Sequence, residues 1–268
     1  MMPQAMHNLA VTNLFHEIAP GQTRLAFFGK DNRLLDVWFD PLHCPNLIGS
    51  AHNIRIDRVF ASQNRATGRL GNGAMVSVRL RKADASLASA GAIVPVTITA
   101  APRHGKPWQA MIGARLATDC MILLAGLPED AAAIGLSSRI PSEQRAALKA
   151  RLAAEAMPEL PVGFGVILRR NGVNLPNFAT EVSRLVGMWQ NGASEVPKNQ
   201  TGLIFDGGGL LARAKRLVGD VAVLDDPACE DELSCLLDDA IAAAVLPKTP
   251  LACGGHLWCE QSHALWSI

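Results

Sequence analysis

Residues 75–81 read MVSVRLR, and residues 93–99 read IVPVTIT. From the second residue of each stretch on, an aliphatic side chain alternates with a polar residue or a proline. A period of two is typical of a strand with one buried and one open face. Gly68, Gly71 and Gly73 precede the first stretch, as expected for turns between short strands. About five short strands over residues 50–118 predict a small barrel of the OB type.

This predicted barrel carries most of the positive charge of the chain. Residues 50–118 contain ten Lys and Arg against Asp57 and Asp84, a net charge of +8, although the whole chain has only +1. The rest therefore has a net charge of −7. Such asymmetry favours a polyanionic partner, and OB-type barrels commonly bind single-stranded nucleic acid. An evenly solvated, Arg-rich surface is the alternative interpretation.

Composition excludes several classes of protein. The chain has 268 residues, 49% hydrophobic and 18% charged, so it is not disordered. A net charge of +1 excludes a globally basic protein that coats nucleic acid. No apolar run approaches the roughly 20 residues of a membrane helix, and no export signal is visible. The six Cys form no CxxC pair, so reduced thiols and a cytoplasmic location are expected.

Outside the predicted barrel the patterns alternate between strands and helices. Ser142 suits the N-cap of one helix, and Glu143 suits its positive end. The apolar side chains of the next helix, Phe178, Val182, Leu185 and Trp189, follow helical spacing and are expected in the core. The sequence predicts a hairpin at 24–39 that turns at 30–32, buried strands at 120–124 and 165–169, helices at 142–157, 178–189, 210–218 and 233–241, and an extended segment at 257–268.

Six segments, in this order, resemble motifs of the ribonuclease E/G family of bacterial endoribonucleases. No single segment is decisive, but their order and the position of the basic segment make the resemblance specific. The segments are PGQTRLAFFGKDNRLLDVWF (20–39), LIGSAHNIRIDRV (47–59), ARLATDCMILLAGLPEDAAAIGLSSRI (114–140), GFGVILRRNGV (163–173), GLLARAKRLVGD (209–220) and VLPKTPLACGGHLWCEQSHALWSI (245–268).

The resemblance implies a mixed α+β fold of several parts. Residues 1–49 and 203–245 would form a discontinuous RNase-H-like subdomain. A five-stranded OB-type RNA-binding barrel at 50–118 and an α/β 5′-sensor domain at 119–202 would be inserted into it. Residues 246–268 would supply the first strand of a truncated deoxyribonuclease-I-like domain.

The family cleaves single-stranded RNA with magnesium held by two Asp carboxylates. By this resemblance the first of them would follow Ile268, so no catalytic residue or metal ligand is assigned here. We therefore do not expect cleavage by these 268 residues alone. Asp225, Asp226, Asp238 and Asp239 are possible replacements, but a solvated helix surface explains the latter pair better. The resemblance leaves open a homo-oligomer of a full-length form and a monomer of these residues.

The barrel departs from the family pattern. Thr67 and Ala74 stand near the two positions where the family stacks Phe on bases, so RNA binding is expected to be mainly electrostatic. Trp108 either substitutes for them or belongs to the core. Lys106 matches a family Lys along the RNA path, with Arg103 and His104 beside it; an exposed basic turn without a ligand is the alternative. The predicted RNA-binding surface is Lys106, Arg103, His104, Arg65, Arg69 and Arg79.

The resemblance also suggests a site for the 5′-phosphate of RNA. Arg169 matches the phosphate-binding Arg of the family, and a guanidinium can hold a terminal phosphate by two hydrogen bonds. Arg170 replaces a family Thr; it either reaches the phosphate or faces solvent. Ile122 stands where a backbone group of the family completes the pocket. A structural ion pair of Arg169 is the alternative.

Two other patterns suggest ligands only weakly. Cys253, His256, Cys259 and His263 have the spacing C-x2-H-x2-C-x3-H, but residues on one strand would not converge on a zinc ion. The run Asp206-Gly-Gly-Gly209 precedes a helix but lacks the Lys-Ser/Thr of a P-loop. A turn and a helix start explain it better.

Three functions therefore stay open. The first is an RNA-binding protein of the ribonuclease E/G type, and the second is a catalytically silent RNA-binding or regulatory protein. The third, an unrelated α/β metabolic enzyme, predicts no affinity for RNA and no salt dependence.

Overall fold

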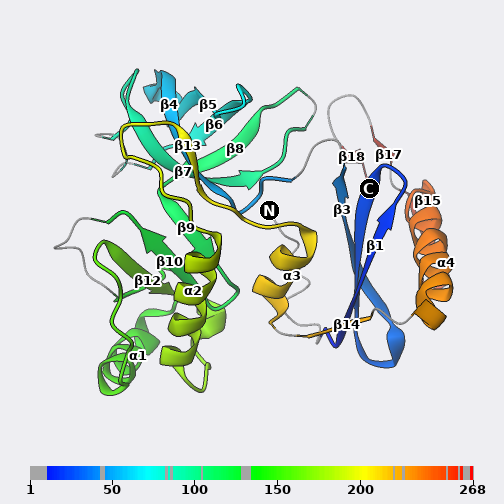
Figure 1. Ribbon diagram of the computed structural model, residues 1–268. Helices are drawn as coiled ribbons and strands as arrows, with labels where there is room; N and C mark the ends of the chain where they lie inside the picture. The colour runs from blue at the N-terminus through cyan, green and yellow to red at the C-terminus, as the bar shows by residue number, and fades with distance from the viewer. Residues whose placement is uncertain are drawn as a thin grey trace. The chain divides into compact units, whose positions relative to one another are not determined.

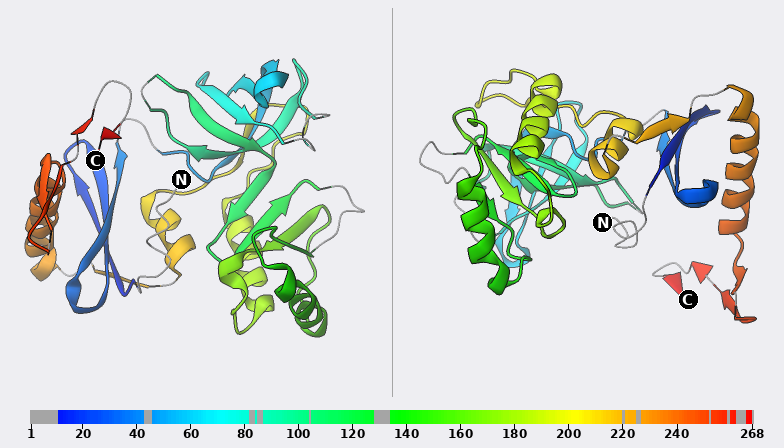
Figure 2. Two further views of the ribbon diagram at one scale, coloured as in Figure 1. Left: turned by 180° about the vertical axis from the view of Figure 1, so that it is seen from behind. Right: turned by 90° about the horizontal axis from the view of Figure 1, so that it is seen from below.

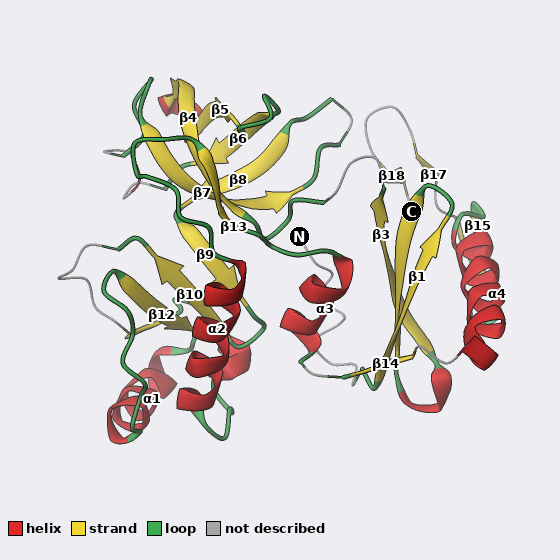
Figure 3. Ribbon diagram, in the orientation of Figure 1, coloured by secondary structure: helices red, strands yellow, loops and turns green. Residues whose placement is uncertain are grey.

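The computed structural model describes residues 11–42, 46–81, 84, 87–103, 105–127, 134–219, 221–224, 227–251, 253–258, 260–261 and 266–267. Over these residues the protein is a mixed α+β chain with a closed five-stranded barrel and four α-helices (Figures 1 and 3). The chain divides into two compact units. One unit contains Asp40–Asp220, and the other joins the segment that ends at Phe39 to Val221–Ile268.

The barrel belongs to the first unit and forms from five consecutive strands. They are β4 (Ala51–Phe60), β5 (Arg65–Arg69), β6 (Met75–Arg79), β7 (Ile93–Ala100) and β8 (Trp108–Ile112). The order around the barrel is β4-β5-β6-β8-β7, and pairing of β7 with β4 closes it. Strands β6 and β8 run parallel, and all the other barrel pairs are antiparallel. A further strand, β13 (Gly202–Phe205), pairs antiparallel with β4.

Alternation along the strands fills the barrel. The inward side chains are aliphatic, as the stretches 75–81 and 93–99 predict, and each fully buried one stabilises the fold by about 1.5–3 kcal/mol. The principal buried residues of this core are Ile54, Ile56, Val76, Val78, Val94, Val96, Ile98, Trp108 and Ala110. The strands predicted within 75–81 and 93–99 are confirmed as β6 and β7.

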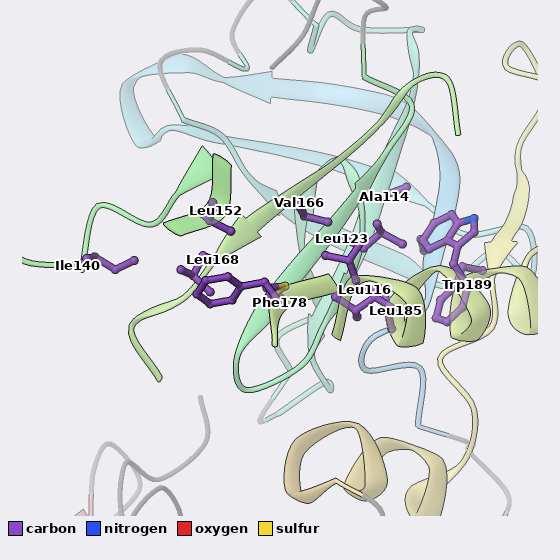
Figure 4. Packing of buried hydrophobic residues seen from close by; sticks show 14 of the residues in the cluster. Ala114, Leu116, Leu123, Ile140, Leu152, Val166, Leu168, Phe178, Leu185 and Trp189 are labelled. Carbon is purple, nitrogen blue, oxygen red and sulfur yellow. The ribbon is translucent and has the colours of Figure 1, made fainter. Parts of the chain in front are cut away.

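A second sheet follows the barrel in the same unit. Its strands, in the order β11-β12-β10-β9, are β9 (Ala114–Ala117), β10 (Met121–Ala125), β11 (Ile134–Leu136) and β12 (Phe164–Leu168). Helices α1 (Ser142–Ala154) and α2 (Phe178–Gly192) pack against it (Figure 2). Figure 4 shows the shared core, in which Leu123 and Val166 of the sheet meet Leu152 of α1 and Leu185 of α2.

The two helices begin differently, which corrects one expectation. The side chain of Asn177 caps α2 by accepting a hydrogen bond from the Thr180 amide at 2.8 Å. Helix α1 has Pro141 at its N-cap position, so the prediction that Ser142 caps it is wrong. The Ser142 hydroxyl instead contacts the Glu143 carboxylate at 3.3 Å. Pro141 has a φ of −53°, which the proline ring favours at the start of a helix.

Helix α2 buries the side chains that its spacing predicts. Phe178, Val182 and Leu185 have no exposed surface, and Trp189 is 6% exposed. Helix α3 (Leu210–Val218) follows β13 and confirms the helix predicted at 210–218; its residues Leu210 and Ala214 are buried. Gly209 is its N-cap residue, and the Asp206 side chain accepts a hydrogen bond from the Gly208 amide. The run 206–209 is therefore a turn and a helix start, as expected.

The second unit contains a four-stranded sheet and one long helix. Strands β1 (Asn13–Ala19), β2 (Gln22–Phe28), β3 (Leu34–Pro41) and β14 (Ala222–Leu224) have the order β14-β1-β2-β3. Helix α4 (Pro227–Ala244) packs on this sheet through Leu233 and Leu237, which contact the cluster of Phe15, Ala26 and Phe28 (Figure 1). The predicted hairpin is confirmed as β2 and β3 around a turn at Lys30–Asn32, whereas β1 is a strand that the sequence pattern did not predict.

The end of the chain is extended in short pieces. Beyond α4 the structure contains β15 (Lys248–Pro250), β16 (His256–Trp258), β17 (Glu260–Gln261) and β18 (Trp266–Ser267). Strand β15 pairs with β16, and β17 pairs with β18. These pairs agree with the extended segment predicted at 257–268, within the described residues.

Candidate nucleic-acid interface

A bulge in β4 decides which side chains reach the outer face of the barrel. Ile54 and Ile56 point into the core, and the register with β5 then shifts between Ile56 and Arg58. Asp57 is the extra residue of this bulge. Beyond it Val59 packs against the core. Because alternate residues of a strand face opposite sides, Arg58 and Phe60 lie on the outer face.

Three rows of side chains cross this outer face. Cross-strand neighbours on one face have Cβ atoms about 4.5–5.5 Å apart, so each row is a line of close neighbours. By the register of the strands, the rows are Arg55–Arg69–Met75, Arg58–Thr67–Ser77–Gln109 and Phe60–Arg65–Arg79–Met111. We call these residues the arginine face. Its five arginines are all exposed.

Two of the cross-strand pairs bring like charges together. Arg55 lies opposite Arg69, and Arg65 lies opposite Arg79. Like charges directly opposite each other destabilise a sheet, by a few tenths of a kcal/mol for each pair in the absence of a counter-charge. A bound polyanion would remove this cost. The arrangement therefore favours phosphate groups as the ligand of this face.

The arginines are held mostly by neutral acceptors. Arg65 donates hydrogen bonds to the Ser77 hydroxyl at 3.1 Å and to the Gln109 amide oxygen at 3.5 Å. Arg55 donates to the carbonyl of Gly91, and Arg69 donates to the carbonyl of Gly73. Arg69 also lies 3.4 Å from the carboxylate of Asp57. These contacts orient the side chains but leave most of their charge uncompensated.

The loop between β7 and β8 adds further positive charge beside this face. Arg103 and Lys106 are exposed and pair with each other across the turn. They line a shallow pocket of about 400 Å³ together with Met75, the end residue of one row of the arginine face. The structure thus brings the predicted residues Arg65, Arg69, Arg79, Arg103 and Lys106 to one side of the barrel. The prediction for His104 falls outside the described residues.

The structure also places Thr67 and Ala74, which stand near the two positions where the resembled family stacks Phe on bases. Thr67 lies in the middle row of the arginine face, and Ala74 lies partly buried just before β6. Trp108 is 6% exposed and belongs to the barrel core. Of the two interpretations of Trp108, the structural one is correct.

Arg169 and Arg170 lie at the end of β12 in the first unit. The predicted strand at 165–169 ends at Leu168, one residue earlier than expected, and Arg170 begins a one-turn 3₁₀ helix. The guanidinium of Arg169 donates a hydrogen bond to the Thr118 carbonyl, and its amide donates to the Cys120 carbonyl at 2.8 Å. Arg170 is exposed. Arg169 therefore braces the turn before β10, whereas Arg170 is open to solvent.

Ile122 lies on the neighbouring strand. It pairs with Ala117 of β9 on one side and with Ile167 of β12 on the other. Its side chain faces away from the core that Met121 and Leu123 form with the helices. Cys120, not Ile122, is the β10-side neighbour of Arg169.

A cavity of about 490 Å³ lies beside this turn. Residues of three segments line it: Thr118–Cys120, the α2 residues Glu181, Arg184 and Met188, and Lys215–Gly219. Glu181 accepts hydrogen bonds from Arg184 and from the Thr118 hydroxyl. Burial, with help from Asp119, raises the pKa of the Cys120 thiol to about 11. This thiol stays protonated at neutral pH, so it is a poor nucleophile.

The structure places some of the carboxylate, Cys and His residues that the sequence offered as metal ligands. Arg24 is buried and forms ion pairs with Glu17 and Asp238, which explains the position of Asp238 structurally. Asp239 is an exposed helix residue. Cys253 and His256 are exposed, and Cys259, His263, Asp225 and Asp226 fall outside what the structure describes. Within the described part of the chain no three His, Cys, Asp or Glu side chains gather into a group that could hold a metal ion.

No protein-family model matches the chain, and no curated protein matches it. The helices in the described ranges include none that is long and apolar enough to cross a membrane. The arginine face and the sequence resemblance are therefore the two observations that bear on function.

The charged and aromatic residues that β4 adds to the arginine face, Arg55, Arg58 and Phe60, were not predicted from the sequence as site residues. The signal was present in the spacing of the apolar residues. Ile54, Ile56 and Val59 keep one face only if an extra residue lies between the last two. A bulge at Asp57 follows from that spacing, and it turns Arg58 and Phe60 outward.

Proposed function

We propose that this chain is an RNA-binding protein of the ribonuclease E/G type, and that single-stranded RNA binds across the arginine face. The observation that carries the proposal is the pair of like-charge neighbours, Arg55 with Arg69 and Arg65 with Arg79, on one exposed barrel surface. Like charges side by side repel each other, and a bound polyanion would compensate them.

The topology of the barrel supports the same ligand. If the barrel strands β4 to β8 are numbered 1 to 5 along the chain, their order around the barrel is 1-2-3-5-4, and strand 4 pairs with strand 1 to close it. Strand 3 runs parallel to strand 5. Barrels of the OB type bind oligonucleotides on the face of strands 2 and 3 and on the loop between strands 4 and 5. Here strands 2 and 3 carry Arg65, Arg69 and Arg79, and that loop carries Arg103 and Lys106.

The proposal assigns RNA binding to this chain and does not include catalysis. Magnesium, the metal of the resembled family, would supply an activated water and neutralise charge on the phosphate. The described residues offer no ligand cluster for it, so we assign no step to the metal. RNA binding without cleavage by these residues is common to the first two hypotheses drawn from the sequence.

A comparison of two double variants tests the proposal. The probe is a fluorescein-labelled 12-nucleotide RNA without secondary structure, and the readout is fluorescence anisotropy at two salt concentrations. Arg65→Gln with Arg79→Gln removes two phosphate contacts, and we expect the slope of log K against log salt to flatten by about 1.4. We also expect an affinity loss of about tenfold or more at low salt.

The matched control removes equal charge elsewhere. Arg139 and Lys149 are exposed residues outside the barrel. Arg139→Gln with Lys149→Gln should leave both affinity and slope close to those of the unaltered chain. Equal losses in the two double variants would show a non-specific effect of net charge and would reject the arginine face. An unaltered chain without RNA affinity would favour the metabolic-enzyme alternative.

A further inference from the structure

We infer that Phe60 is a base-stacking platform of the arginine face, so that the ligand is a single strand with accessible bases and not merely a polyphosphate. This inference rests on the proposed function, because it concerns the same face. It adds an aromatic contact to a surface whose other outward side chains are arginines, small polar residues, Gln109 and methionines.

The position of Phe60 follows from the strand register. Phe60 pairs with Arg65, and Val59 pairs with the buried Ala66. The side chain of Phe60 therefore points away from the core and stands beside Arg65 on the outer face. The ring is half-buried, and it is not among the apolar side chains packed against the barrel core.

A neighbouring arginine fixes the ring. The guanidinium carbon of Arg58 lies 5.0 Å from the ring centroid of Phe60, within the range of a cation–π interaction. This guanidinium covers one face of the ring. A base stacked on the remaining surface would complete an arrangement of cation, ring and base.

Phosphate groups and a base can bind here at the same time. Phe60 ends the row that continues to Arg65 and Arg79, so positive charge begins at the strand next to the ring. A single strand offers a base and its flanking phosphates in this way, whereas a duplex keeps its bases stacked on one another. The geometry therefore favours single-stranded over double-stranded RNA.

The test separates stacking from charge with two probes. One is a fluorescein-labelled 12-mer of uridine, and the other is an abasic ribose-phosphate strand of equal length and charge. Phe60→Leu removes the ring but keeps an apolar side chain. We expect this variant to bind the uridine 12-mer about tenfold more weakly, a change of about 1.4 kcal/mol, and to bind the abasic strand unchanged. Phe60→Trp should restore the affinity for the uridine 12-mer.

The control variant alters Trp258 in the other unit, an aromatic residue that, like Phe60, has a cationic side chain over its ring. Trp258 is 54% exposed, and the ammonium of Lys248 lies 5.5 Å from its ring centroid. Trp258→Leu should leave both affinities unchanged. Because the abasic strand reports only on charge, its unchanged affinity also shows that the Phe60→Leu barrel is folded.

Three outcomes would overturn the inference. If the Phe60→Leu variant binds both probes as tightly as the unaltered chain does, Phe60 does not contact the ligand. Equal weakening for both probes would give Phe60 a structural role only. An unaltered chain that binds neither probe would overturn the proposed function as well, so the two failures are distinguishable.

Discussion

Arg169 and Arg170 are adjacent in the sequence but differ in their contacts. Arg169 is partly buried and donates to the Thr118 carbonyl, whereas Arg170 is exposed at the start of a 3₁₀ turn. The resemblance to the ribonuclease E/G family suggests both as ligands of a 5′-phosphate. At the scale of the residue, Arg170 is the side chain open to a ligand, because it is exposed and no hydrogen bond or ion pair holds its guanidinium among the described residues.

We therefore expect Arg170→Gln to lower the preference for a 5′-monophosphate over a 5′-hydroxyl by about threefold to tenfold. Arg169→Ala should also lower this preference, and it should in addition destabilise the turn that Arg169 braces. Competition binding with the two forms of one 12-nucleotide RNA measures the effect. Equal discrimination by Arg170→Gln and the unaltered chain would exclude Arg170 from a 5′-phosphate site.

His52 is a buried residue of β4 with a defined hydrogen bond. The Ser50 hydroxyl donates to the Leu47 carbonyl at 2.6 Å, so Nε2–H of His52 is the donor in the 2.8 Å contact with Ser50. Burial lowers the pKa of His52 below its usual value, and the carboxylate of Asp206 opposes the shift. The neutral imidazole is therefore the form that fits the folded protein.

This lowered pKa sets the direction of one pH effect. As the pH falls through about 6.5, the unfolded chain binds a proton at His52 before the folded chain does. His52 should therefore stabilise the fold above that pH and lose this contribution below it. Urea denaturation at pH 7.5 and pH 5.5 should show a smaller loss for His52→Gln than for the unaltered chain. The same loss in both proteins would contradict the assignment.

At the scale of the element, the bulge in β4 needs a close approach of β5. A Cβ added at Gly68 would lie 2.5 Å from the Arg55 carbonyl oxygen and 3.0 Å from Cδ1 of Ile54. Glycine at this position therefore lets the two strands pair beside Asp57 and sets the rows of the arginine face.

Gly68→Ala should cost about 1–3 kcal/mol of unfolding free energy, because the added methyl group meets backbone that cannot move freely. At Gly71, a few residues further on, an added Cβ would have no heavy atom within 4 Å beyond its chain neighbours. Gly71→Ala is the matched control and should change stability by no more than about 0.5 kcal/mol. Chemical denaturation measures both, and equal stability of the two variants would reject the close packing at Gly68.

The sequence predicted those elements whose periodicity has one clear buried face. Strands β6 and β7 and helix α2 are examples, since their apolar residues alternate or follow helical spacing without interruption. Strand β1 was not predicted, because it lies between β14 and β2 and buries the consecutive residues Leu14 and Phe15. Such a strand shows no alternation.

The candidate site was predicted in part for a related reason. Arg65, Arg69 and Arg79 lie on strands with a regular pattern, and the structure brings them to one face. Arg55, Arg58 and Phe60 lie on either side of a bulge, where the period of two slips by one residue. The loop residues Arg103 and Lys106 were predicted as site residues only from the family resemblance, because hydrophobic periodicity does not indicate where the side chains of a loop lie.

At the scale of the whole molecule, charge is segregated along the chain. The barrel segment 50–118 carries +8 while the remaining residues sum to −7. Single-stranded nucleic acid should therefore be drawn to the barrel and repelled by much of the other surface, an effect that salt screens over about 10 Å at 0.1 M.

The most direct test is the salt dependence of single-stranded RNA binding by the unaltered chain. Arg55, Arg65, Arg69, Arg79, Arg103 and Lys106 offer up to six phosphate contacts on the barrel. With all six made, log K should fall with log salt at a slope of about −4, and with three made at about −2. Titrations between 50 and 200 mM salt, roughly the range over which such contacts are resolved, would measure it. A slope in that range supports the account. A slope near zero, or no binding at the lowest salt concentration, would contradict it.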